Sequence, residues 1–392
     1  MSGPFPDTST CKRCGMPLAY DRFVAGVPAD APRTSLCTFC SMPEGLRNAV
    51  PYRCAPWALD LVFDVYRRRL SPWRGIASAA RHIRVLPTRA RAFAELVHLV
   101  PRPKPDRKYD IVVLYSGGKD SSYMLLDLSR RGFRVCAWML NQGYQSPIAI
   151  ENARRLCTTL GVDLHIDVPE NARMNSLFRL GFDIDLRETP ELVRAVMTYG
   201  SACWPCFSTI AARATKFCSE NDAAFCFIGT QAGQNRLDYG GQGSLDSVVP
   251  RPEYLLDKFI GPIAALASER APGSADLLQR SECPNTILLP YYEFVPKPPV
   301  EQQIAKLQKA GWKMPNNTGA CSTNCMINEL GRQVMRRKFG FDLYQIIDAN
   351  ERRLRPGAGP APVAPLDAHA VRRGAEMLKL TPEEKAGYGI HA

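Results

Sequence analysis

Residues 111 to 122 read Ile-Val-Val-Leu-Tyr-Ser-Gly-Gly-Lys-Asp-Ser-Ser, a β-favouring run followed by a glycine-serine loop. Gly117 and Gly118 allow the backbone to turn sharply after Tyr115 without a Cβ clash. A helix is expected to begin near Asp120. Free backbone N–H groups at a helix start, together with the helix dipole, favour an anion there. The stretch therefore predicts a strand, a phosphate-binding loop and a helix.

The side chains of this loop also suit phosphate. Ser116, Ser121 and Ser122 supply hydroxyl donors, and Lys119 supplies a positive charge. The spacing fits neither the Walker A pattern nor the three spaced glycines of the dinucleotide-binding pattern. It resembles the PP-loop of the N-type ATP pyrophosphatases, which split ATP between its α and β phosphates and attach AMP to a substrate oxygen.

That resemblance implies ATP and Mg²⁺ as cofactors and an adenine nucleotide alpha hydrolase-like fold. It implies that the whole loop binds ATP: Ser116, Gly117, Gly118, Lys119, Asp120, Ser121 and Ser122. Catalytic roles are expected for Ser116, Lys119, Asp120 and Ser121, with Mg²⁺ held near Asp120. A non-enzymatic RNA-binding or scaffold protein with a decayed loop is a remote alternative, against which the intact loop sequence argues.

The length, composition and charge of the chain limit the classes of protein to which it can belong. A chain of 392 residues has room for two or three domains, and no stretch approaches the ~20 apolar residues of a membrane span. The first residues lack the apolar core of a signal peptide, so we expect a cytoplasmic protein. The net charge of +12 suggests an anionic partner, which could be nucleic acid, a nucleotide-linked sugar or a membrane surface. The sequence leaves the monomer and the homodimer open.

Four cysteines near the start form two close pairs. Cys11-x-x-Cys14 is followed after 22 residues by Cys37-x-x-Cys40, which is close to the spacing of a four-thiolate zinc ribbon. In a reducing compartment such pairs are metal or redox ligands rather than disulfides. We therefore predict one structural Zn²⁺ in a zinc-ribbon module formed by residues 1–50.

A basic helical linker is expected over residues 51–108. Its stretch from 67 to 91 holds eight arginines and no acid, and apolar residues recur there at roughly helical spacing. We predict two or three short helices, broken by Pro72 and Pro87. The arginines form either a phosphate or membrane-surface patch or a solvated helix face.

Residues 109–350 are expected to form a PP-loop ATP pyrophosphatase domain with a C-terminal helical extension, and from Tyr109 to about Thr230 the pattern alternates between strand and helix. Strands are expected over 110–115, 134–140, 163–167 and 224–229, and helices over 120–131, 147–160, 190–199 and 207–219. This alternation predicts an α/β, Rossmann-like parallel sheet covered by helices, with its ligand crevice at the carboxyl ends of the strands.

Polar residues follow two of these strands. Asn141 comes after the second strand, and Gly229, Thr230 and Gln231 come after the fourth. All four are candidates to line the nucleotide site, and a plain connecting loop is the alternative.

A further cysteine pair, Cys203-Trp204-Pro205-Cys206, lies just before a predicted helix. A thiol at a helix N-terminus is expected to have a lowered pKa. Cys283, Cys321 or Cys325 could join the pair, and Cys325 is the candidate third metal ligand. Cys203 and Cys206 are also candidate catalytic residues. An iron-sulfur cluster, a second zinc site, a redox pair and a cysteine-rich core all remain open.

Several motifs together resemble the bacterial N-acetyl-sugar amidotransferases of surface-polysaccharide synthesis. They are the loop, Cys-Lys-Arg-Cys-Gly-Met-Pro at 11–17, Leu-Asp-Tyr-Gly-Gly at 237–241, Asn-Cys-Met-Ile-Asn-Glu at 324–329 and Lys-Phe-Gly-Phe at 338–341. The resemblance implies an enzyme that adenylates the acetamido oxygen of a nucleotide-linked sugar and replaces it with nitrogen. The ammonia would come from a partner glutaminase.

The central cysteine pair departs from that family pattern. A Cys-x-x-Cys with a later cysteine beside a PP-loop is similar to the tRNA 2-thiolation enzymes. The alternative is therefore a sulfurtransferase that acts on tRNA with a sulfur donor and a [4Fe-4S] cluster on Cys203, Cys206 and Cys325. The arginine-rich insert, and the stretch from Arg355 to Pro365 in the predicted Pro/Ala-rich tail of residues 351–392, also lie outside the amidotransferase resemblance.

Overall fold

The computed structural model describes most of the chain: residues 8–28, 32, 34–44, 56–82, 96–230, 234, 252–282, 285–319, 321–353 and 362–390. Several sequence predictions fall outside these residues. They concern Pro87 and the arginines beyond residue 82, Gln231, residues 237–241 and Cys283.

One parallel sheet organises the described residues, and it confirms the predicted α/β, Rossmann-like fold. Its strands are β1 (Ile111–Leu114), β2 (Val135–Leu140), β3 (Asp163–Asp167), β4 (Phe225–Ile228) and β5 (Ile287–Pro290). Their order is β3-β2-β1-β4-β5, and every neighbouring pair is parallel. In such a sheet all the carboxyl ends lie at one edge, so the segments that follow the strands gather there.

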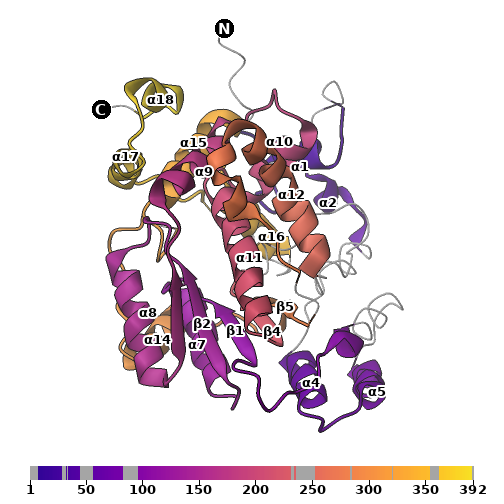
Figure 1. The fold of residues 1–392 in the computed structure, drawn as a ribbon. Coiled ribbons are helices and arrows are strands. Elements are labelled where there is room, and N and C mark those ends of the chain that lie inside the picture. Colours follow the sequence, from indigo (N-terminus) through magenta and orange to yellow (C-terminus); the bar gives the residue numbers. More distant parts are fainter. Residues whose placement is uncertain are drawn as a thin grey trace.

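Helices cover both faces of the sheet because its central strands are apolar on both sides. On one face lie α7 (Lys119–Ser129), α8 (Pro147–Leu160) and α14 (Val300–Lys309), and on the other lies α11 (Cys203–Glu220). Val113 of β1 belongs to the core that contains Leu125 and Leu156, whereas Val112 belongs to the core that contains Ala214 and Cys218. Figure 1 shows α8 and α11 on opposite sides of the strands.

A helical layer lies above the sheet in Figure 1. It includes α9 (Asn171–Asp183), α10 (Pro190–Tyr199), α12 (Pro252–Arg270), α15 (Asn328–Phe339) and α16 (Leu343–Arg353), with the 3₁₀ helix η2 (Pro272–Leu278). The predicted tail adds two more helices, α17 (Ala368–Met377) and α18 (Pro382–Gly387). This layer shares one hydrophobic core with the cysteine module at the start of the chain, whose helices are α1 (Leu18–Val24) and α2 (Thr38–Ser41).

The basic segment begins with α4 (Pro56–Tyr66) and α5 (Pro72–His82). Pro72 opens α5, where its missing N–H costs nothing, so the expected break at this proline is present. α4 packs beneath the sheet, since the ring of Phe63 lies 5.8 Å from that of Phe225. The Tyr66 hydroxyl donates to the Asp110 carboxylate over 2.6 Å.

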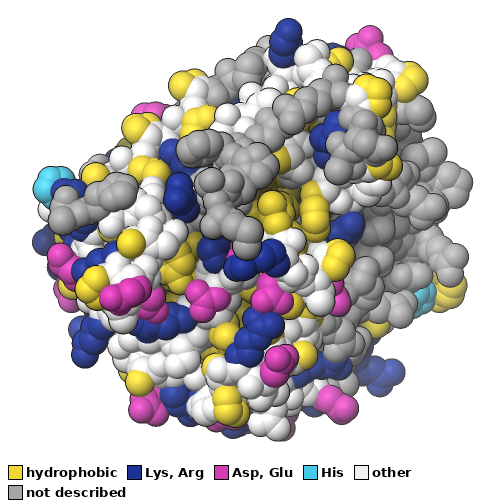
Figure 2. Space-filling view, turned by 90° about the horizontal axis from the view of Figure 1, so that it is seen from above, with side chains coloured by type: hydrophobic (Ala, Val, Ile, Leu, Met, Phe, Trp, Pro, Cys, Tyr) yellow, Lys and Arg dark blue, Asp and Glu magenta, His cyan; other side chains and the backbone are white. Residues whose placement is uncertain are grey.

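The surface is mixed in charge on the face that Figure 2 shows. Lysine and arginine side chains there are interspersed with acidic ones around yellow hydrophobic patches, so the net charge of +12 does not gather into one basic patch among the coloured residues of this face. Among the described residues, no helix combines the length and apolar character needed to cross a membrane.

Candidate nucleotide-binding site

The loop at 116–122 connects β1 to α7 by a turn that only glycine fits. Gly117 has a φ of +71°, in the region that favours glycine, and a Cβ placed on it would lie 1.9 Å from the carbonyl oxygen of Ala149 in α8. Gly118 is the N-cap of α7. A Cβ on Gly118 would approach the Thr323 hydroxyl to 2.9 Å. The loop is thus pressed against α8 and against a segment from much later in the chain.

Three serine hydroxyls have different surroundings. The Ser116 and Ser121 hydroxyls lie 3.0 Å apart, and the Gly118 N–H points to Ser116 Oγ at 3.4 Å. Both serines belong to the mouth of the loop. Ser122 is fully buried, and its hydroxyl lies 3.1 Å from the Tyr115 hydroxyl, so in this structure it faces the interior.

Asp120 lies between two lysines. Lys119 Nζ is 2.7 Å from one carboxylate oxygen and Lys297 Nζ is 3.0 Å from the other. Gln303 also donates to this carboxylate over 3.1 Å. Burial by itself raises the pKa of Asp120, but the charges of Lys297 and Lys119 outweigh it, and the pKa is lowered below its ordinary value. The carboxylate is therefore ionised at neutral pH.

Burial lowers the pKa of Lys119, and the nearby charge of Lys297 lowers it further. Other groups fix the backbone here: the Tyr292 hydroxyl donates to the Asp120 carbonyl over 2.8 Å, and the Trp312 indole donates to the Gly117 carbonyl over 2.9 Å. Lys297, Gln303, Tyr292 and Trp312 were not among the site residues predicted from the sequence. The signal that could have found them is the apolar run 287–290, read as a further strand that ends at the same edge.

Residues 322–325, which come late in the chain, lie beside the loop. The Lys119 N–H donates to the Thr323 hydroxyl over 3.0 Å, and the Ser146 N–H donates to the Asn324 carbonyl over 2.7 Å. Gln145 pairs with Cys325 in an isolated antiparallel bridge. The motif at 324–329 therefore begins beside the PP-loop.

The two candidate lining segments lie where the sheet topology predicts. Asn141 follows β2 directly, and its N–H donates to the Asp167 carbonyl at the end of β3 over 2.8 Å. Gly229 follows β4, and its Cβ position is 3.6 Å from Ser121 Cα. Thr230 is nearly buried at the same edge.

Cys203, Cys206 and Cys325 lie in the same region at this edge, and a Cys325 thiolate would raise the pKa of both other thiols. Among the described residues, the group of side chains arranged to hold a metal ion is Cys11, Cys14, Cys37 and Cys40, and it does not include these three. The Gln142 amide, in the loop after β2, lies 3.5 Å from Cys206 Sγ. The three cysteines thus border the loops that follow the strands. Cys321 lies apart, in an environment that includes Arg332 and Glu329.

One prediction about these cysteines is wrong. The sequence suggested a lowered thiol pKa before a helix that starts near residue 207, but α11 begins at Cys203, so the pair lies in its first turn. Burial raises the pKa of Cys203 to about 12 and that of Cys325 to about 11. Desolvation of the thiolates outweighs the helix dipole, which acts weakly by comparison.

The first cysteine cluster has the geometry of a metal site. The sulfurs of Cys11, Cys14, Cys37 and Cys40 all lie within 4.8 Å of one another, and all four residues are buried. Cys14 and Cys37 Sγ are 3.7 Å apart. Tetrahedral zinc with Zn–S bonds near 2.3 Å requires roughly 3.8 Å between sulfurs.

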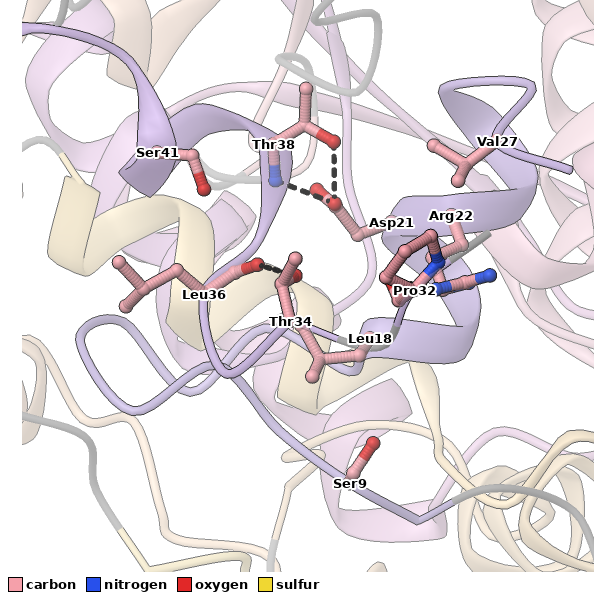
Figure 3. A pocket seen from close by; sticks show the side chains of 10 residues that line it. All are labelled: Ser9, Leu18, Asp21, Arg22, Val27, Pro32, Thr34, Leu36, Thr38 and Ser41. Carbon is pink, nitrogen blue, oxygen red and sulfur yellow. Dashed lines mark hydrogen bonds between the residues drawn. The ribbon is translucent and has the colours of Figure 1, made fainter. Parts of the chain in front are cut away.

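Two charged groups surround this cluster. The Arg353 guanidinium donates to Cys37 Sγ over 2.9 Å, which offsets the negative charge of ligating thiolates. Asp21 accepts from both the N–H and the hydroxyl of Thr38, at 2.7 and 2.8 Å, and so fixes the start of α2. Figure 3 shows this pair in a small pocket that Arg22 and Leu36 also line.

No family model matches this chain. Two curated proteins are similar to part of it, both named 7-cyano-7-deazaguanine synthase. The protein of Rhizorhabdus wittichii is 29% identical over 144 residues, which cover 37% of this chain and 57% of the relative. That of Solidesulfovibrio magneticus is 29% identical over 154 residues, which cover 38% of this chain and 60% of the relative.

The chain thus spans under two thirds of the length of these relatives. Both are PP-loop proteins, and neither is a sugar amidotransferase. The loop sequence, the parallel sheet and this similarity together support placing the chain in the PP-loop ATP pyrophosphatase superfamily.

Proposed function

We propose that this chain is an ATP-dependent, AMP-forming amidotransferase that adenylates an oxygen of an N-acetyl sugar and replaces it with nitrogen. The observation that carries the ATP chemistry is the loop at the start of α7, where two lysines flank Asp120 at the carboxyl edge of a parallel sheet. Similarity to ATP-dependent PP-loop synthases supports the same chemistry. The sugar rests on the motif resemblance alone.

The residues of the loop have separate roles in binding ATP and Mg²⁺. The β and γ phosphates of ATP lie against the N–H groups of Gly117 and Gly118 and the hydroxyls of Ser116 and Ser121. Lys119 offsets charge on the leaving pyrophosphate. Asp120 is the one carboxylate within residues 116–122, and it would hold Mg²⁺ that enters with ATP.

The acceptor and the nucleophile complete the proposal. The acceptor oxygen attacks the α phosphate, and AMP then leaves when ammonia from a partner glutaminase displaces it. The acceptor is a nucleotide-linked sugar, whose phosphates suit a basic protein. The four N-terminal thiols hold one structural Zn²⁺.

Sulfur transfer to tRNA is the second candidate, and it rests on the Cys203-x-x-Cys206 pair and the later Cys325 in the sequence. In that reading the three thiols would hold a four-iron cluster with one iron open. In that case the nucleophile is sulfide rather than ammonia.

The decisive experiment measures pyrophosphate and AMP from ATP, with ammonium and a nucleotide-linked N-acetyl sugar. Ser116→Ala and Asp120→Ala should each abolish pyrophosphate release, because they remove a phosphate donor and the charge that organises the lysines. Ser129→Ala, at the far end of the same helix, is the matched control and should retain full activity. Undiminished turnover in both loop variants would exclude this loop as the site.

The same preparation separates the two nucleophiles when it is purified without oxygen. Ammonia predicts colourless protein and an amidino product, with Cys203→Ala harming stability more than turnover. Sulfide predicts brown protein with about four irons per chain, and loss of a thiolated RNA product in Cys203→Ala and Cys206→Ala alike. Complete absence of pyrophosphate release with either acceptor would favour the non-enzymatic alternative.

A further inference from the structure

Lys297 reaches the PP-loop from a strand that is not adjacent to β1. It follows β5 and the short helix α13 (Tyr291–Phe294), and β4 separates β5 from β1 in the sheet. Because all five strands are parallel, the end of β5 and the PP-loop open at the same edge. The helix that follows, α14, packs beside α7, as Figure 1 shows.

An ion pair with Asp120 holds the side chain of Lys297 at the loop. Its Nζ lies 3.0 Å from Asp120 Oδ1, and Lys119 Nζ occupies the other carboxylate oxygen at 2.7 Å. All three side chains are largely but not fully buried, with 19%, 21% and 17% exposure for Lys297, Asp120 and Lys119. They therefore remain open to a ligand that enters the loop.

The charges of this group do not balance. Two ammonium groups share one carboxylate, which leaves a net charge of +1 at the positive end of α7. Neutralising Asp120 requires only one lysine, and Gln303 already donates to the oxygen that Lys297 contacts. The second lysine adds repulsion toward Lys119, which is a cost to the ligand-free protein unless an anion uses it.

We propose that Lys297 is a second phosphate ligand, which leaves Asp120 and binds the β and γ phosphates of ATP when the nucleotide enters the loop. Asp120 is then a positioning residue that keeps both lysines at the mouth of the loop between turnovers. This proposal rests on the proposed ATP chemistry. A structural role, in which Lys297 only neutralises Asp120, is the alternative that the experiment must separate.

The test is calorimetric titration of the full-length protein with three probes: MgATP, magnesium pyrophosphate and AMP. Lys297→Ala should weaken both MgATP and pyrophosphate by at least about tenfold, the loss expected for one hydrogen bond to a charged group. AMP lacks the β and γ phosphates, so its affinity should stay within about twofold. Lys297→Arg keeps the charge and should restore most of the pyrophosphate affinity.

Lys306→Ala is the matched control. Lys306 lies on α14, the helix that follows Lys297, and its Nζ contacts the Tyr123 hydroxyl at 3.3 Å and not the loop. Its removal should leave all three affinities unchanged.

Two results would overturn the role of Lys297: unchanged MgATP affinity in Lys297→Ala, or equal weakening of MgATP and AMP with a lower melting temperature. The second result would show a structural role. If the wild-type protein binds neither MgATP nor pyrophosphate, the proposed function itself is wrong. The assignment of ATP phosphates as the ligand of Lys297 is then wrong as well.

Discussion

Two independent constraints require glycine at position 117, and the effect of each on stability can be measured. The residue needs a positive φ, and its missing Cβ leaves room for the carbonyl oxygen of Ala149, 1.9 Å from where a Cβ would be. A left-handed conformation costs a residue with a side chain roughly 1–2 kcal/mol. A backbone carbonyl of α8 cannot move as a flexible side chain can, so the steric term comes in addition.

Gly117→Ala should therefore lose ATP binding and destabilise the protein by more than the conformational term alone. Gly161 is a suitable control, because it has a φ of +63° and no atom within 4 Å of its Cβ position. Gly161→Ala should cost roughly 1–2 kcal/mol and leave ATP binding intact. Urea denaturation and MgATP titration of both variants give the comparison, and equal behaviour would refute the steric argument.

Sequence alone could predict the residues that the loop contributes, because strand, glycine turn and helix start are local features. It could not predict those that come from elsewhere in the chain. Lys119 and Gln303 are 184 residues apart, and Lys119 and Thr323 are 204 apart. No local propensity encodes such pairings; they follow from the order of strands in the sheet.

At the scale of elements, α15 and α16 are joined through a buried arginine. Arg332 donates to Glu329 over 2.8 Å and to Asp342 over 3.2 Å, and all three side chains are at most 2% exposed. The Ala364 carbonyl accepts another of its hydrogen bonds, at 2.7 Å. Arg332 thus holds two helices and the segment that leads into α17.

Arg332→Ala should destabilise the protein by about 3–5 kcal/mol, because it leaves the buried Glu329 carboxylate without its cation. Asp342 keeps its ion pair with Arg336 at 2.7 Å. Arg187→Ala is the control, because the Arg187 side chain pairs with Asp185 but is 90% exposed. An ion pair this exposed to solvent contributes little to stability. Chemical denaturation should show the difference in midpoint, and similar midpoints would mean that the buried network adds little.

The helices and strands that were predicted correctly are those with a distinct sequence pattern. The four predicted strands and the helices at 147–160 and 190–199 are present within about one or two residues, because each has clear apolar runs or proline at its start. β5 is as short as β1 and β4, and it was missed because it ends in Pro290, which argues against a strand. α12 was missed because it carries Pro262 in its interior. The helix α9 was not predicted, and the C-terminal helical extension was predicted without the bounds of α15 and α16, although the amphipathic faces of these helices complete the large core.

For the whole molecule, the cysteine module is part of the main body. The Tyr20 hydroxyl lies 3.3 Å from that of Thr198 in α10, and the rings of Tyr20 and Phe341 meet edge to face at 5.9 Å. Arg353, the last residue of α16, donates to Cys37. Metal binding by these thiols is therefore coupled to the packing of α10 and α16.

Cys11→Ser should lower the zinc content by about one ion per chain, as a four-thiolate site predicts. Hydrogen exchange should then speed up in α10 and α16 as well as in residues 8–44. Cys157→Ala is the control, since Cys157 is a buried cysteine of α8 that belongs to another core. It should retain its zinc. Faster exchange confined to residues 8–44 would show that the module is energetically independent.

The distant partners of the PP-loop also determine when the site can form in the cell. A ribosome that adds 5–20 residues per second needs roughly 10–40 s to travel from the loop to Thr323. Until residues 287–303 have been made, the nascent chain has the loop but neither Lys297 nor Gln303, and β4, once made, exposes the edge that β5 will later cover. An uncovered strand edge is a template for pairing with another chain. Translation of the residues between β4 and Thr323 is therefore the period in which a folding helper would matter most for the nucleotide site.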